Sequence, residues 1–207
     1  NSTDQVLKGF TSNPAGAWAT GGTMNNSRAG SGAGLGIYTS AIVAAGGNPA
    51  ETTTEQYNGS SWTEIADVNT ARKSWGTGSG TTTAGLVYGG VINPSTVIAN
   101  NESWNGSSWT ETTDLNTARG LGAASTQGTS TASLMMSGQT TPSNFLDNNE
   151  SWNGSSWTEV SDLNTARRGG GGAGTQTSAL YFGGGNPSAN TSTESWDGTS
   201  WTEVADL

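Results

Sequence analysis

One arginine and one glutamate recur in every copy of a sequence repeated along this chain, and they are the first candidates for chemistry. The arginines are Arg28, Arg72, Arg119 and Arg167, and the glutamates are Glu55, Glu102, Glu150 and Glu194. A ring of arginines facing an axis could hold an anionic substrate, because a guanidinium binds carboxylate or phosphate bidentately. Recurrence in every copy favours a structural role instead, in which each arginine pairs with a glutamate or with backbone carbonyls. We therefore expect these residues to stabilise the fold.

Each copy also ends in an acidic pair. The pairs are Glu64/Asp67, Glu111/Asp114, Glu159/Asp162 and Glu203/Asp206. Glycoside hydrolysis needs two carboxyl groups in different environments, whereas these pairs are equivalent, and the sequence has no D-x-D-x-D-G loop for calcium. The sequence also has no His and no Cys, so the commonest general base and the usual zinc ligands are missing. We interpret the acidic pairs as solvated surface and expect no enzyme, no metal and no cofactor.

The charge balance restricts the classes of partner. The 207 residues carry a net charge of −9, with seven basic residues spread along the chain. Nucleic acids and anionic membrane surfaces attract clustered Lys and Arg, so neither is expected as a partner. No apolar run approaches the roughly 20 residues that span a bilayer. The sequence thus predicts no nucleic acid binding and no membrane insertion.

The repeat itself is read from the tryptophans. Trp18, Trp62, Trp109, Trp157 and Trp201 are 44 to 48 residues apart, a period typical of a four-stranded blade or a helical hairpin. The copies "EQYNGSSWTE", "ESWNGSSWTE" (twice) and "ESWDGTSWTE" place Asn-Gly or Asp-Gly between aromatic residues. This pattern predicts a hairpin with a tight primed turn, in which both central residues adopt positive φ.

Two further strands are expected upstream of each hairpin. Each repeat has a Gly- and Ala-rich segment after its arginine, such as "RRGGGGAG", followed by a short apolar run such as "ALYFGGG". Runs of this length suit buried strands and are too short for helices. Four short antiparallel strands repeated radially form a β-propeller blade. The small residues of the first strand would then line a crowded central axis, which suggests few blades.

The order of these elements resembles the kelch repeat. In each copy an arginine precedes a small-residue strand, an apolar strand ending in Gly-Gly, an "E-x-aromatic" strand, and a tryptophan that begins a short last strand. In the third repeat Gly138-Gln139 replaces the double glycine, and the Asn-Gly turn is shorter than kelch turns. The sequence "ESWNGSSWTE" is also similar to repeats in tail-fibre-like proteins of marine phages. These resemblances imply an all-β, kelch-like β-propeller of antiparallel four-stranded blades.

We expect one domain with four full blades and a partial one. The blades run approximately over residues 25–67, 68–114, 115–162 and 163–207, and residues 1–24 align with only the last two strands of a repeat. Either a thin fifth blade closes the ring, or four blades close it and the N-terminal piece is a cap. Neighbouring chains completing the ring are the third alternative.

The loops between second and third strands differ in length and content from repeat to repeat, and specificity is usually carried by variable loops on a constant scaffold. Neutral drift is the alternative explanation. Trp75 occurs in one repeat only, so it is the aromatic first expected to contact a ligand, whereas the repeated aromatics are expected to pack between blades. The predicted ligand or partner contacts are Trp75, Asn93, Asn101, Asn144, Phe145, Asn186 and Asn190.

The sequence therefore predicts a non-catalytic interaction module on an extracellular or virion surface, of tail-fibre or appendage type. Its expected partners are a surface glycan or a protein receptor, or neighbouring virion or appendage subunits, and it could form a homo-oligomer. A structural decoration or spacer subunit is the alternative. A sialidase-like hydrolase is a further one, since the arginine cluster of sialidase propellers holds an anionic substrate. It would require a blade that breaks the repeat symmetry with clustered carboxylate and tyrosine residues.

Overall fold

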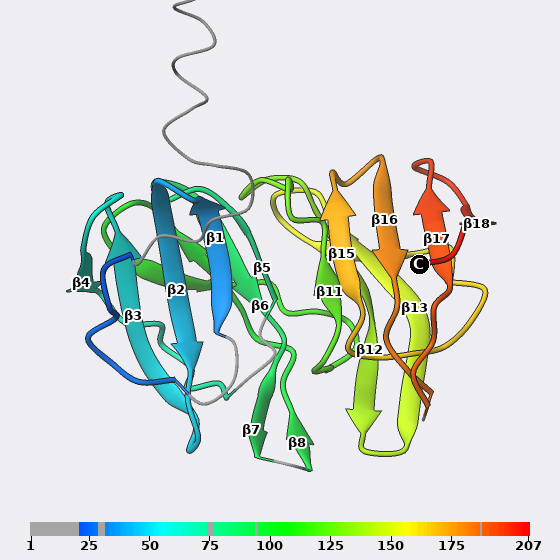
Figure 1. The fold of residues 1–207 in the computed structure, drawn as a ribbon, viewed down its shortest axis with the longest axis horizontal. Coiled ribbons are helices and arrows are strands. Elements are labelled where there is room, and N and C mark those ends of the chain that lie inside the picture. The colour runs from blue at the N-terminus through cyan, green and yellow to red at the C-terminus, as the bar shows by residue number, and fades with distance from the viewer. Residues whose placement is uncertain (1–20, 29–31, 74–76, 94, 187) are drawn as a thin grey trace, which may run out of the picture.

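The computed structural model describes residues 21–28, 32–73, 77–93, 95–186 and 188–207. Over these residues it is all-β and consists of four antiparallel four-stranded sheets, with one additional two-stranded hairpin (Figure 1). The sheets are the blades of a four-bladed β-propeller, which confirms the predicted fold class. No helix in this part of the chain is long and apolar enough to cross a membrane.

Each blade uses strands in nearly sequential order. Blade 1 contains β1 (Ala33–Ile37), β2 (Ser40–Gly46), β3 (Glu51–Tyr57) and β4 (Trp62–Ile65). Blade 2 contains β5 (Thr77–Gly80), β6 (Gly85–Tyr88), β9 (Asn101–Trp104) and β10 (Trp109–Thr112), with the hairpin β7 (Val91–Asn93) and β8 (Thr96–Val97) between its second and third strands. Blade 3 contains β11 (Ala123–Ala124), β12 (Ser133–Thr141), β13 (Asn144–Trp152) and β14 (Trp157–Val160). Blade 4 contains β15 (Gly171–Gly174), β16 (Ala179–Phe182), β17 (Thr193–Trp196) and β18 (Trp201–Val204).

The first strands of consecutive blades lie against one another along the axis, which accounts for their small residues. A Cβ added to Gly78 would lie 2.8 Å from Leu35 Cδ2 and 3.2 Å from Ala33 Cβ of blade 1. A Cβ on Gly172 would lie 2.4 Å from the carbonyl oxygen of Ala124 in blade 3. At these positions only glycine allows the neighbouring blade to approach so closely.

The outer hairpins differ from the predicted tight primed turn. Tyr57 pairs with Trp62, so the connection has four residues, 58–61. Gly59 has φ of 97°, but Asn58 is not among the residues with positive φ. The Asn58 side chain instead accepts hydrogen bonds from the backbone N–H groups of Ser60 and Ser61, at 3.0 and 2.9 Å. The prediction of two central residues with positive φ was wrong, because this asparagine acts through its side chain, as in an Asx-turn.

In blade 4 an aspartate occupies this turn position, and it makes the turn sensitive to acid. Hydrogen bonds from the Ser200 backbone N–H, then from the Thr199 hydroxyl and N–H, lower the pKa of Asp197 to about 2. Because the pKa is below its ordinary value, the stabilisation is complete above about pH 4 and is lost as the pH falls toward 2. We expect Asp197→Asn to lose less stability than the wild type between pH 5 and pH 2, because the amide oxygen accepts the same hydrogen bonds without titrating. Urea unfolding at both pH values measures the difference, and identical declines would contradict the assignment.

The core lies at the interfaces between consecutive blades. One cluster joins blades 1 and 2, a second joins blades 2 and 3, and a third joins blades 3 and 4. In each interface the aromatic pair of one blade faces the preceding blade, as with Trp104 and Trp109, whose ring centroids are 5.1 Å apart. The repeated tryptophans of blades 2, 3 and 4 therefore pack between blades, as predicted, whereas Tyr57 and Trp62 of blade 1 are only partly buried.

Candidate functional site

The variable loops gather on one side of the propeller, which we call the loop face. It consists of segments 47–50, 89–93, 95–100, 139–144, 183–186 and 188–192, together with the interblade linkers 66–73, 113–120 and 161–168. Backbone hydrogen bonds join linkers to loops here, for example Arg72 N–H to Glu51 O at 3.1 Å and Gly90 N–H to Arg119 O at 2.9 Å. The β7–β8 hairpin and the ends of β12 and β13 project from this side, at the lower edge of Figure 1.

The repeated arginines lie beneath this face and are not available to a ligand. Each forms an ion pair with the repeated glutamate, and the N–O distances are 3.1, 2.7, 2.8 and 3.0 Å for Arg28–Glu55, Arg72–Glu102, Arg119–Glu150 and Arg167–Glu194. The paired side chains are buried, with at most 5% of any of them exposed. The structural interpretation of these residues is confirmed.

The glutamate of each pair also fixes the linker. Glu102 accepts hydrogen bonds from the backbone N–H groups of Asn69 and Thr70, at 2.6 and 3.1 Å, and from the Asn69 side chain at 2.9 Å. Burial lowers the pKa of Arg72, and the charge of Glu102 opposes that shift. The network joins the linker to blade 2, since the arginine donates its remaining hydrogen bonds to the carbonyl oxygens of Thr70, Gly89 and Asn100.

Two other basic residues lie on the loop face and form no ion pair with a described glutamate or aspartate. Lys73 and Arg168 directly follow two of the paired arginines, and both are half-buried. Lys73 Nζ donates to Asn48 Oδ1 at 2.9 Å. Arg168 donates to the Gln139 side-chain oxygen, and its guanidinium carbon lies 4.9 Å from the centre of the Phe145 ring. No described carboxylate lies within ion-pairing distance of either cation, so both can accept an anionic or oxygen-rich ligand.

Five of the predicted contact residues lie on or beside this face. Asn93 is exposed, and its side chain accepts hydrogen bonds from Ser95. Asn144 is exposed at the β12–β13 tip and donates to Thr140, while the adjacent Phe145 lies under Arg168. In the blade 4 loop, Asn186 donates to the Ala166 carbonyl at 2.8 Å, and Asn190 accepts from the Ser192 N–H at 2.6 Å. The β12–β13 tip thus combines an aromatic ring, a cation and two amides, Gln139 and Asn144.

Two of the predicted residues do not join this cluster. Asn101 is fully buried, and its side chain donates to the Thr113 carbonyl at 3.3 Å, so its placement as a surface contact is corrected. It is the first residue of β9, where it pairs with Tyr88 of β6, so it belongs to the sheet and not to the loop. Trp75 lies outside the described residues.

Lys73 and Arg168 were missed as site residues. A signal was present, because a second basic residue follows the repeated arginine only in "RK" (72–73) and "RR" (167–168). Because the other repeats fold without this second basic residue, it is not needed for the blade and is a candidate for binding. The β7–β8 hairpin was also expected only as a loop.

A sialidase-like hydrolase would require a tyrosine near carboxylates at the axis, for which the sequence offers Tyr38, Tyr88 and Tyr181. Tyr88 is fully buried and donates to or accepts from the Ser133 hydroxyl at 2.8 Å, and burial raises its pKa to about 12. Tyr181 is also buried, and burial raises its pKa. Tyr38 is 90% exposed, in the connection between β1 and β2.

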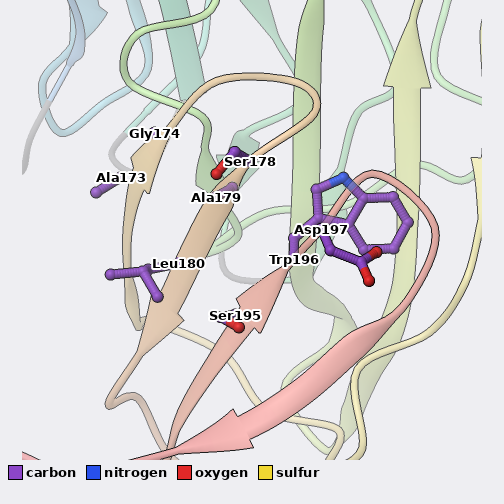
Figure 2. Close-up of a pocket in the computed structure, with 8 residues that line it drawn as sticks. All are labelled: Ala173, Gly174, Ser178, Ala179, Leu180, Ser195, Trp196 and Asp197. Atoms are coloured by element: carbon purple, nitrogen blue, oxygen red, sulfur yellow. The ribbon is translucent and has the colours of Figure 1, made fainter.

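A separate hollow of about 470 Å³ lies on blade 4, where residues of β15, β16 and β17 line it (Figure 2). Small and apolar residues such as Ala173 and Leu180 line it, with the hydroxyls of Ser178 and Ser195. Its one carboxylate, Asp197, is already used in the hairpin turn. None of the predicted contact residues that the structure describes lines this hollow.

Comparison with known proteins shows the fold. A solved structure titled "Structure of YjhT" superimposes with a TM-score of 0.74 at 11% sequence identity, over 90% of this chain and 68% of that chain. At this identity the likeness shows a β-propeller and nothing finer. No protein-family model matches the sequence, and no curated protein matches it significantly. The kelch and tail-fibre resemblances stay predictions from the sequence.

Proposed function

We propose that this propeller is a non-catalytic interaction module of an extracellular or virion surface, and that its loop face binds a surface glycan. A protein receptor presenting acidic side chains is the alternative ligand. The observation that carries the proposal is the position of Lys73 and Arg168, two cations without a described carboxylate partner on the loop face of a chain whose net charge is −9.

The chemistry of the β12–β13 tip supports a sugar that bears a carboxylate or many hydroxyls. A guanidinium binds a carboxylate through two parallel hydrogen bonds, and a ring such as Phe145 offers an apolar surface beside it. Asn144 adds an amide that donates and accepts. Hairpins on a rigid sheet hold these groups with little loss of freedom on binding.

The acidic pairs of blades 1 and 2 lie in equivalent environments, which supports a non-catalytic role, because hydrolysis of a glycoside uses two carboxyl groups in different environments. For example, Asp67 accepts a hydrogen bond from the Thr54 N–H at 3.0 Å, and Asp114 accepts one from the Asn101 N–H at 3.3 Å. Blade 3 differs, since burial and the nearby charges of Asp147 and Glu159 raise the pKa of Asp162. The tail-fibre or appendage type of surface is proposed from the sequence resemblance. Weak sites of this kind gain avidity when several copies are held together.

A glycan array that includes neutral and carboxylate-bearing glycans tests the proposal. We expect the wild-type chain to bind, and Lys73→Ala/Arg168→Ala to bind at least about tenfold more weakly, because hydrogen bonds from charged groups contribute about 1.5–3 kcal/mol each. The matched control is Thr110→Glu/Thr158→Glu, which changes the net charge equally at exposed positions of β10 and β14. It should bind like the wild type.

Circular dichroism and urea unfolding establish that each variant is folded. No binding by a folded wild-type chain would contradict the glycan proposal. Equal weakening by the control would show that net charge, and not the loop face, governs binding. In either case a structural decoration or spacer subunit becomes the better explanation.

A further inference from the structure

Every interface between consecutive blades is built from equivalent positions. The downstream face of a blade, which we define as the face toward the next blade, supplies residues from its first and second strands. In blade 1 these are Ala33, Leu35, Ile42 and Ala44, all with at most 4% exposure. The upstream face of the next blade supplies Val87, Trp104 and Trp109. The same positions meet between blades 2 and 3 and between blades 3 and 4.

The downstream face of blade 4 has the same positions but no described blade against it. Strand register places Leu180 and Phe182 where Ile42 and Ala44 lie in blade 1. Leu180 is 39% exposed, whereas Ile42 and its equivalents in blades 2 and 3 are 0% exposed. Val204, on the same face, is 40% exposed. The hollow in Figure 2 lies over this face, so a complete half of an interface is open there.

The upstream face of blade 1 is the complementary open half. Its aromatic pair is Tyr57 and Trp62, and its second strand contributes Ala41 and Val43. All four are partly exposed, whereas their equivalents in blades 2, 3 and 4 are buried. Trp62, for example, corresponds to Trp109, which is 6% exposed.

The polar groups of this upstream face are already satisfied within the chain. Trp62 Nε1 donates to the Gly22 carbonyl at 3.1 Å, as Trp109 Nε1 donates to the Ala66 carbonyl. Asn25 donates to Glu55 as Asn69 donates to Glu102. Burial of Trp62 would therefore remove apolar surface from water without leaving its indole N–H unpaired.

We propose that the downstream face of blade 4 docks the upstream face of blade 1 of a second copy of this chain. The chain itself carries both halves of an interface that occurs three times inside it, so a second copy supplies the complementary chemistry without any further partner. A contact between two different faces is heterologous: repeated from copy to copy, it forms a ring if the rotation closes and a filament if it does not. The proposal goes beyond ligand binding, because it involves neither Lys73 nor Arg168.

Association of the full chain in solution tests the contact. We expect light scattering after size-exclusion chromatography to give a mass above the 20.9 kDa of one chain, increasing with concentration. Leu180→Asp should weaken association more than tenfold. Ile92→Asp on β7 is the matched control, since Ile92 is also 39% exposed but lies on the loop face, and it should associate like the wild type. A monomeric wild type, or equal loss in both variants, would overturn the proposal.

Engineered disulfides identify the occupant, because the chain has no cysteine of its own. Ser79 and Ser133 bring their hydroxyl oxygens to 2.9 Å across the interface between blades 2 and 3, and the equivalent positions are Ala173 in blade 4 and Ala41 in blade 1. Mixing Ala173→Cys chains with Ala41→Cys chains should give a disulfide-linked heterodimer on a non-reducing gel. Ser79→Cys/Ser133→Cys is the positive control and should crosslink within one chain.

The double variant Ala173→Cys/Ala41→Cys separates the alternatives. A ladder of linked chains supports head-to-tail docking. A crosslink confined to single chains would show that blades 1 and 4 of one molecule close on each other, and would overturn the proposal. Absence of any crosslink, with the positive control formed, would overturn it as well.

Discussion

Replacing Glu102 with alanine is expected to lower the free energy of unfolding by about 3–5 kcal/mol, because removal of one partner leaves a buried charge uncompensated. The Arg72 side chain is 1% exposed and Glu102 is fully buried, with an N–O distance of 2.7 Å. Glu102 also accepts the backbone N–H groups of Asn69 and Thr70, so the linker between blades 1 and 2 loses its anchor in the same variant. Urea unfolding followed by tryptophan fluorescence measures the change.

The matched control is Glu111→Ala. Glu111 lies directly opposite Glu102 on the neighbouring strand, but it is exposed. Its removal loses only an exposed hydrogen bond from the Asn100 side chain and should change stability by no more than about 1 kcal/mol. A loss below about 1 kcal/mol for Glu102→Ala would contradict the structural role of the ion pairs, and would reopen a ligand-binding role for the arginines.

Replacing Trp109 with alanine is the second large effect, expected at about 3–5 kcal/mol, as for buried aromatic side chains truncated in a core. Trp109 is 6% exposed and packs with Leu35, Ile42 and Val87 at the interface between blades 1 and 2. The cavity left behind lies between two blades whose inner strands are already in close contact, so collapse of the site is restricted.

Trp62→Ala is the internal comparison for this variant. Trp62 has the same place in blade 1 and the same kind of indole hydrogen bond, at 3.1 Å, but no described blade covers it. Its removal should cost less than half as much at low protein concentration, and more at concentrations where copies dock head to tail. Equal costs for the two variants at low concentration would show that the upstream face of blade 1 is already covered.

Much of the fold could be predicted because its signals are local and repeated. Hairpins with an aromatic residue on each side of a turn, short apolar runs, and small residues in the first strand each indicate a strand through neighbours in sequence. The pairing of Arg72 with Glu102 could be predicted because both residue types recur in every repeat, and a residue present in every blade is expected to stabilise the blade. The turn type was wrong, because Asn58 caps the turn with its side chain, and sequence alone does not distinguish this from positive φ.

The candidate site was predicted only in part. Phe145 and Asn144 were identified because variable loops carry specificity, but Asn101 was placed at the surface although it lies in a strand. Its equivalent in the third repeat, Asn149, is also fully buried. Alignment of these two repeats could therefore have indicated that Asn101 belongs to a strand and not to a variable loop. Lys73 and Arg168 were missed because their freedom from carboxylate partners depends on which charges lie nearby in space.

The sequence by itself determined the four full blades and most of the residues that pack between them, because strand formation and repeat periodicity depend on local order along the chain, but it left open how the ring closes. The tertiary structure decided which surfaces are left over. Leu180 in blade 4 and Ile42 in blade 1 have the same place in the repeat, yet one is 39% exposed and the other fully buried. Both residues are apolar and lie at the same position of the second strand, so the local sequence does not distinguish them. Their burial depends on whether another blade packs against them. Only the arrangement of the four described blades shows where such a neighbour is missing.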